Sequence, residues 1–155
     1  MNLNIATNAD FRYNEEKTCE RMRSMKKDRV LNPKILEAVA TTGHTDMLVI
    51  GDCGLPLPRG VEVIDVSVTA GLPRFMDLLK AVNTEFVAES AIVASEVEEK
   101  NPEVWAQIQK EMNGAPIRLV PHEELKRITA SARYIIRTGE TSPYANIILI
   151  GGVNF

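Results

Sequence analysis

Two histidines are the residues of this chain best suited to moving a proton. His44 stands in the run Gly43-His44-Thr45-Asp46, a polar turn between a helical pattern and an apolar run. An imidazole titrates near neutral pH, so it can serve as a general acid or base, which is typically worth about 10²- to 10⁴-fold in rate. The alternative is that His44 caps the carboxyl end of the helix, where the helix dipole favours an imidazolium. Taken alone, the turn favours that structural role.

His122 is the second histidine, and it lies four positions before Lys126 in a segment that we expect to be helical. This spacing places both side chains on one face of the helix, where a ring and a cation could bind or polarise hydroxyl groups. The alternative is a solvent-exposed face on which Glu123 and Glu124 pair with Lys126. Because no cysteine or carboxylate lies at ligand spacing from the histidines, we expect no metal site.

Asp52 follows the apolar run that ends at Ile50 and has glycines at positions 51 and 54. Those glycines let the backbone bend and let a ligand approach closely. Carboxylates at the carboxyl ends of strands in α/β sheets often bind hydroxyls or orient a base. The alternative, given equal weight, is an Asx-turn in which the side chain bonds its own loop. Cys53 has no base spaced for it, so we interpret it as a small buried filler rather than a nucleophile.

Tyr144 and Asn146 flank Ala145 where an apolar run begins. If that stretch is extended, the two side chains point the same way. An aromatic face with a hydroxyl, beside an amide that donates and accepts, could hold a polyol by stacking and hydrogen bonding. The alternative is a turn whose tyrosine fills the core. No glycine-rich dinucleotide or Walker pattern is present, so phosphate or dinucleotide binding has little support.

Helical and strand patterns alternate around these residues. Short apolar runs predict strands, and helical spacing of apolar residues predicts helices. The predicted strands are 47–50, 61–66, 86–93, 117–120, 134–137 and 146–150, and the predicted helices run from Pro33 to just before Gly43, from Pro73 past Val82, over 102–112 and over 121–129. The alternation predicts an α/β fold, a three-layer α/β/α domain with a mixed, largely parallel central sheet, because the connection 138–145 is too short for a crossover helix.

Composition and charge limit the class of protein, its partners and its location. The chain has 155 residues, 45 % of them hydrophobic, and a net charge of −3, which fit one globular domain and give no footprint for nucleic acid. No apolar run approaches the roughly 20 residues that cross a bilayer, and acids near the start argue against a signal peptide, so we expect no membrane partner and a cytoplasmic location.

Cys19 and Cys53 are expected to be free thiols. We expect residues 1–24 to be a flexible extension, or a start-site or cloning artefact with Met25 as the start, and residues 25–155 to be the single domain.

Six strings, in this order and with matching spacing, resemble the D-ribose pyranase / L-fucose mutarotase family over about Met25 to Phe155. They are Val30-Leu31-Asn32-Pro33, Gly43-His44-Thr45-Asp46, Asp52-Cys53-Gly54-Leu55-Pro56-Leu57-Pro58, Gly71-Leu72-Pro73 with Phe75-Met76, His122-Glu123 with Lys126, and Gly139-Glu140-Thr141-Ser142-Pro143-Tyr144-Ala145-Asn146. The third and sixth resemble the ribose branch of the family. The residues before Met25 depart from it.

The resemblance implies a cofactor-free isomerase that interconverts the pyranose and furanose forms of D-ribose. It implies that His44 matches the catalytic histidine, and the positions it matches to sugar contacts are Asp52, His122, Lys126, Tyr144, Ala145 and Asn146. It also implies a homo-oligomer, a decamer of two stacked pentamers with sites near subunit boundaries. Two alternatives stay open: a mutarotase for L-fucose or another monosaccharide, and a non-catalytic sugar-binding protein of a transport operon.

Overall fold

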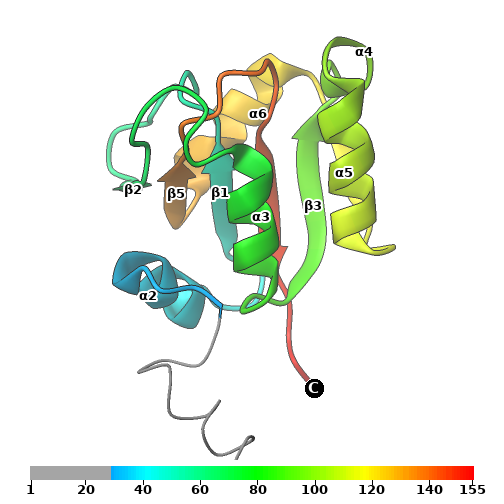
Figure 1. The fold of residues 1–155 in the computed structure, drawn as a ribbon. Coiled ribbons are helices and arrows are strands. Elements are labelled where there is room, and N and C mark those ends of the chain that lie inside the picture. Colours follow the sequence, from blue (N-terminus) through cyan, green and yellow to red (C-terminus); the bar gives the residue numbers. More distant parts are fainter. Residues whose placement is uncertain (1–28) are drawn as a thin grey trace, which may run out of the picture.

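The computed structural model describes residues 29–155, and in this part of the chain one sheet lies between helical layers (Figure 1). The strands are β1 (Met47–Gly51), β2 (Glu62–Asp65), β3 (Ala88–Ala94), β4 (Ile117–Val120), β5 (Tyr134–Arg137) and β6 (Ile147–Gly151). The helices are α2 (Pro33–Thr41), α3 (Phe75–Asn83), α4 (Val97–Lys100), α5 (Pro102–Met112) and α6 (His122–Ile128), with a 3₁₀ turn η1 (Thr129–Ser131) after α6. The predicted extension 1–24 and Cys19 lie outside the described residues.

The strand order across the sheet is β2-β5-β1-β6-β3-β4. Strand β6 runs antiparallel to both of its neighbours, β1 and β3, whereas the other neighbouring pairs are parallel. The mixed, largely parallel sheet is therefore confirmed. The short connection after β5 explains the one reversed strand, although β6 does not pair with β5. It enters the sheet on the far side of β1.

Alternate residues of the central strands face two different cores, as the twofold period of a strand requires. Leu48 and Ile50 of β1 pack in the core beneath α2, α3 and α5, whereas Val49 packs in the core beneath α6. All three are fully buried. Because helices cover both faces, the three-layer α/β/α prediction is confirmed.

Local signals in the sequence fix the helix ends. Asn32 accepts hydrogen bonds from the amides of Lys34 and Ile35, at 2.9 and 3.3 Å, and Pro33 occupies the first turn of α2. The range of α5 is the predicted one. Helix α4 was not predicted, because four residues are too few to show a helical period. The ends of most other elements shift by one or two residues, within the usual uncertainty of element ends.

Within the described part of the chain, no helix combines the length and apolar content needed to cross a lipid bilayer.

Candidate functional site

The candidate residues divide between the two ends of β1. Asp52 follows the carboxyl end of β1, and Asn146 precedes β6, which is antiparallel to β1, so both lie at the same edge of the sheet. His122 lies near them, through its contact with Tyr144. His44 precedes the amino end of β1, and five residues of strand span about 16 Å at about 3.3 Å per residue. We refer to Asp52, His122, Tyr144 and Asn146 as the carboxyl-end cluster, and to the turn around His44 as the amino-end corner.

Asp52 and Asn146 form a reciprocal hydrogen-bonded pair. The Asn146 Nδ2 donates to Asp52 Oδ2 at 2.8 Å, and the Asp52 backbone amide donates to Asn146 Oδ1 at 2.9 Å. The other carboxylate oxygen of Asp52 accepts from the Gly54 amide at 2.9 Å, which is the Asx-turn named as the alternative. Asn146 is fully buried. The pair therefore holds one carboxylate at the end of β1 in a single orientation.

Gly51 makes room for this pair. A Cβ at Gly51 would lie 2.6 Å from Leu55 Cδ2 and 3.2 Å from Asn146 Oδ1. A side chain there would displace Leu55 and crowd the buried amide. The glycine before Asp52 is thus required by packing rather than by an unusual backbone angle.

His122 and Tyr144 contact each other edge to face. Their ring centroids lie 5.1 Å apart, with an interplanar angle of 86°. The Nδ1 atom of His122 is buried and has no hydrogen-bond partner among the described residues. Buried polar atoms are usually hydrogen-bonded. A ligand or a neighbouring subunit could therefore supply the partner of His122 Nδ1.

The predicted common direction of Tyr144 and Asn146 is wrong. Tyr144 has a φ of 57°, in the left-handed region, and the Asn146 amide donates to the Tyr144 carbonyl at 2.9 Å. The stretch is a turn rather than an extended strand entry. Tyr144 therefore reaches His122, whereas the Asn146 side chain turns inward to Asp52. Ala145 between them is fully buried.

Lys126 lies one turn beyond His122 on α6, and its ammonium pairs with Glu123 at 2.5 Å. The Lys126 side chain is partly buried, whereas the Glu123 side chain is largely exposed. This pair matches the salt-bridged alternative for the helix face. An exposed partner contributes little to stability, so the contact leaves the ammonium available to a ligand.

Two residues at the ends of α4 hold the cluster and were not predicted. Both carboxylate oxygens of Glu96 accept from the His122 backbone amide at 3.0 Å. Asn101 Nδ2 donates to Ser142 Oγ at 3.0 Å and to the Pro143 carbonyl at 2.9 Å. Helix α4 thus fixes the segment that carries His122 at one end and the loop that carries Tyr144 at the other. Their partners lie far along the chain, so no local signal reveals them.

Glu140 is a third unpredicted residue, a buried carboxylate beneath the same loop. It accepts from the backbone amides of Thr141 and Ser142, at 3.0 and 2.9 Å, and from the Phe75 amide at the start of α3, at 3.2 Å. Burial raises the pKa of this carboxyl, but the hydrogen bonds from Ser142, Phe75 and Thr141 together outweigh it and hold the pKa below the usual 4.5. A charged Glu140 therefore orders the loop at neutral pH.

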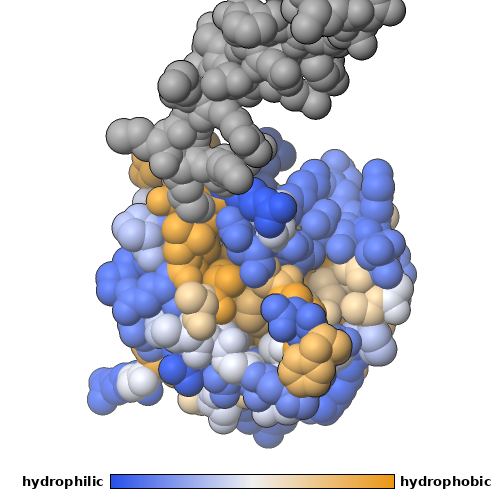
Figure 2. All heavy atoms as spheres, turned by 90° about the horizontal axis from the view of Figure 1, so that it is seen from below, coloured by the Kyte–Doolittle hydropathy of each residue, from blue (hydrophilic) through white to orange (hydrophobic). Residues whose placement is uncertain are grey.

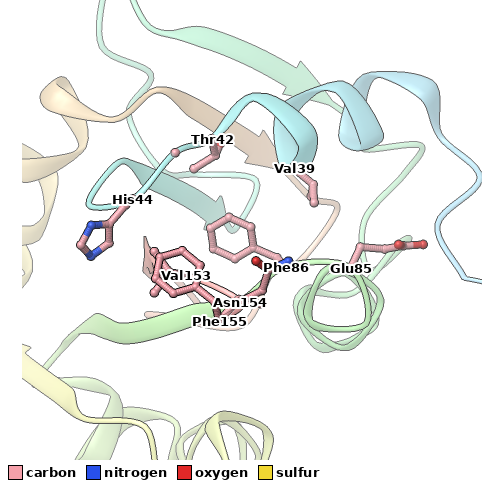
Figure 3. A pocket seen from close by; sticks show the side chains of 11 residues that line it. Val39, Thr42, His44, Glu85, Phe86, Val153, Asn154 and Phe155 are labelled. Atoms are coloured by element: carbon pink, nitrogen blue, oxygen red, sulfur yellow. The ribbon is translucent and has the colours of Figure 1, made fainter.

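His44 lies in the amino-end corner, where its Nε2 is 3.1 Å from Glu89 Oε2 on β3. The ring borders a surface hollow of about 260 Å³ whose other side is lined by Phe86 and the last residues of the chain (Figure 3). The hydrogen bond goes to a carboxylate of β3 and not to a carbonyl of α2, so His44 does not cap α2 through this hydrogen bond. Asp52 does not orient His44 within one chain, because its carboxylate bonds Asn146 and Gly54 at the other end of β1.

Cys53 is a free thiol of intermediate exposure, as expected, and its carbonyl accepts from the Arg137 guanidinium at 2.9 Å. It is therefore not the buried filler that was predicted. Among the described residues, no group of three or more histidine, cysteine or acidic side chains is arranged to hold a metal ion.

Comparison with known proteins matches residues 25–154 to the model of the RbsD / FucU transport protein family. The D-ribose pyranase of Coprothermobacter proteolyticus is 47 % identical over 131 residues, which cover 84 % of this chain and 100 % of that protein. The structure of Bacillus subtilis RbsD complexed with D-ribose is 42 % identical, covers 84 % of this chain and 100 % of that one, and superposes with a TM-score of 0.81. The fucose mutarotase of Streptococcus pneumoniae, in complex with L-fucose, is 25 % identical over 80 % of this chain and 94 % of that one, with a TM-score of 0.66.

Proposed function

The chain belongs to the RbsD / FucU transport protein family, and we propose that it is a D-ribose pyranase, an isomerase that interconverts the pyranose and furanose forms of D-ribose. The observation that carries this proposal is the 47 % identity to a D-ribose pyranase over the whole of that protein. Identity to the fucose mutarotase is 25 %. The ribose activity is therefore favoured over the mutarotase alternative.

The carboxyl-end cluster suits an unphosphorylated sugar. It presents a fixed carboxylate at Asp52 and the His122 ring against the ring of Tyr144, and the helix that carries His122 also carries the Lys126 ammonium. Carboxylates, imidazoles and phenols bind hydroxyl groups as acceptors or donors. We assign hydroxyl binding to Asp52, His122, Lys126 and Tyr144, with the backbone of Ala145 beside them. Asn146 acts on the sugar through Asp52, because its amide is committed to that carboxylate.

The reaction needs only proton transfers. A cyclic hemiacetal opens when the anomeric hydroxyl loses its proton, the bond from C1 to the ring oxygen breaks, and the ring oxygen takes up a proton. The open chain then closes through a different hydroxyl, which changes the ring size. His44 is the group we assign to these transfers, because an imidazole can accept and return a proton near neutral pH.

One chain does not hold a complete site in this scheme, because His44 and the carboxyl-end cluster lie at opposite ends of β1. Symmetric assembly can bring one end of a subunit against the other end of its neighbour. This separation supports a homo-oligomer whose sites lie at subunit boundaries. We propose the ring decamer of two stacked pentamers for this protein.

Exposed apolar surface beside His44 gives independent support for assembly. The hollow next to the ring is lined in part by Val87, Val153 and Phe155, with exposed fractions of 47 %, 41 % and 102 %. Figure 2 shows hydrophobic side chains gathered on this lower face. Apolar patches of this kind commonly mark protein interfaces. A free Cys53 suits the reducing cytoplasm, where we place the protein.

Magnetisation-exchange NMR on D-ribose tests the activity. We expect catalytic amounts of protein to accelerate pyranose–furanose exchange of ribose more than anomer exchange of L-fucose. Faster exchange on fucose would favour the mutarotase alternative. Ribose binding without any acceleration would favour the non-catalytic alternative.

Complementation between inactive variants tests the shared site. His44→Ala and Asp52→Ala each remove one half of the proposed site. If the two halves come from different subunits of a ring, co-expression of the variants restores about a quarter of the sites, because half of the chains carry each residue. A mixture as inactive as either variant, in assemblies shown by mass to contain both chains, would contradict the shared site.

A further inference from the structure

We propose that Glu89 is a positioning residue for proton transfer at His44, which fixes the ring tautomer and stabilises the protonated ring. The inference rests on the proposed function, since it deepens the role of His44 in that reaction. The His44 Nε2 and the Glu89 Oε2 lie 3.1 Å apart although the residues are 45 positions apart in the chain. Among the described residues, this is the hydrogen bond that the ring makes.

A β-bulge places Glu89 opposite His44. Ala88 pairs with Gly151 and Ser90 pairs with Ile150, so β3 carries one residue more than β6 at Glu89. From Ala91 to Val93 the pairing with β6 is regular again. Bulges redirect a side chain away from the ordinary pleat, and they concentrate near active sites. The irregularity falls at the one residue of β3 that bonds His44.

Gly151 of β6, the partner of Ala88 beside the bulge, also holds the backbone around His44. The Thr45 amide donates to the Gly151 carbonyl at 2.8 Å, and the Gly151 amide donates to the Asp46 carbonyl at 2.9 Å. A Cβ at Gly151 would lie 2.3 Å from the Gly43 carbonyl oxygen, so only glycine fits. Gly151 therefore lies between the histidine turn and the bulge and sets their spacing. The ring and the carboxylate are held by a common frame rather than by two mobile loops.

Other acids near the corner face elsewhere. Asp46 Oδ2 accepts from the Gly43 amide at 2.9 Å and from Arg133 Nη1 at 3.2 Å. Glu85 lines the same hollow, but Figure 3 shows its side chain pointing away from His44. Within residues 29–155, Glu89 is thus the carboxylate that bonds the imidazole.

The chemistry follows from the nitrogen that Glu89 occupies. A carboxylate accepts the Nε2 proton, so the neutral ring carries its proton on Nε2 and leaves Nδ1 bare. Nδ1 then takes the anomeric proton as the C1–ring oxygen bond breaks, and it returns a proton to the ring oxygen, so the imidazole is neutral again when the open chain forms. While both nitrogens are protonated, the nearby negative charge stabilises the ring.

Glu89→Gln, Glu89→Asp and, as a matched control, Glu103→Gln test this role by ribose exchange kinetics. Gln keeps the shape and loses the charge, whereas Glu103 is an exposed acid on α5. We expect Glu89→Gln to lower kcat by about 10-fold or more, with KM changed less than about twofold. Glu89→Asp should recover part of the loss, and the control should match the wild type. Wild-type kcat in Glu89→Gln, or a loss confined to KM, would overturn the inference and leave the proposed function standing.

The tautomer can be measured without turnover. Long-range ¹H–¹⁵N NMR of the His44 ring in the intact protein reports which nitrogen holds the proton. We expect Nε2 to be protonated in the neutral ring of the wild type and a mixture of tautomers in Glu89→Ala. A wild-type His44 ring protonated on Nδ1 would overturn the inference, whether or not the protein catalyses exchange. Absence of catalysed exchange would by itself overturn only the proposed function.

Discussion

The two ends of β1 are built differently. At the carboxyl end, Asp52 is held by Asn146 and by its own loop, and Asn146 is fully buried. At the amino end, the side-chain partner of His44 within residues 29–155 is Glu89, and the two side chains are 55 % and 43 % exposed. At one end Asp52 and Asn146 are held by hydrogen bonds to each other, whereas the two side chains at the other end are about half exposed to solvent.

Under the proposed function, the carboxyl end would hold the sugar and the amino end would move its protons. Hydroxyl recognition needs groups that are fixed before the ligand arrives, because ordering them on binding would cost affinity. A group that exchanges protons needs access on one side and a fixed orientation on the other. The hydrogen bonds at the carboxyl end would meet the first need, and the exposed His44–Glu89 pair at the amino end would meet the second.

His44→Ala should break the amino end alone. We expect the catalysed exchange rate to fall by about 10²- to 10⁴-fold, the loss of a general acid–base group. Ribose binding should weaken less, and the free energy of unfolding should stay within about 0.5 kcal/mol because the side chain is half exposed. Exchange NMR, ligand titration and urea unfolding measure the three quantities. Asn154→Ala, at the same hollow, is the control, and an unchanged exchange rate in His44→Ala would remove His44 from the chemistry.

Asn146→Ala should break the carboxyl end in a different way. The substitution leaves the Asp52 amide and carboxylate without their buried partner, so we expect unfolding to become easier by about 1–3 kcal/mol. Ribose affinity should fall as well, because Asp52 loses its fixed orientation. A double-mutant cycle with Asp52→Ala should show coupling of at least about 0.5 kcal/mol. Normal ribose binding by a folded Asn146→Ala would refute this end as the sugar site.

Asn101→Ala sharpens the contrast, because it loosens the carboxyl end without touching its proposed sugar contacts. Its bonds to Ser142 and Pro143 are each worth about 0.5–1.5 kcal/mol. We expect KM for ribose to rise several-fold with kcat nearly unchanged. Lys100→Ala, the exposed neighbour on α4, is the control. A fall in kcat at constant KM would instead connect α4 with the proton transfers.

The smallest expected effect is on the pH dependence of stability, through Glu140 at the carboxyl end. The folded-state pKa of Glu140 is lowered, so its contribution is present above its usual 4.5 and is lost as the pH falls through the lower folded value. We expect the Tm difference between wild type and Glu140→Gln to be constant near neutrality and to shrink below about pH 4.5. Thermal unfolding followed by circular dichroism measures it. A difference that stays constant into acid would show that the charge of Glu140 does not order the loop.

Local pattern was enough for much of the fold. The predicted ranges 102–112, 117–120 and 134–137 are those of α5, β4 and β5. These segments have a clear helical period or a short apolar run, and such patterns depend only on backbone dihedral angles and on which face is buried. Helix α4 was not predicted, because it is too short to show a helical period. The bulge at Glu89 was not predicted either, because it appears only when β3 is aligned with β6.

The sequence by itself determined the α/β class, the candidate groups and, through the six matching strings, the family. It did not determine which groups meet. Asp52 and Asn146 are 94 positions apart, and Glu140 and Phe75 are 65 apart. Only the antiparallel placement of β6 beside β1 joined the first pair. Contacts between distant segments depend on strand order and direction, which are set by how two cores close over the sheet and not by any local run of residues.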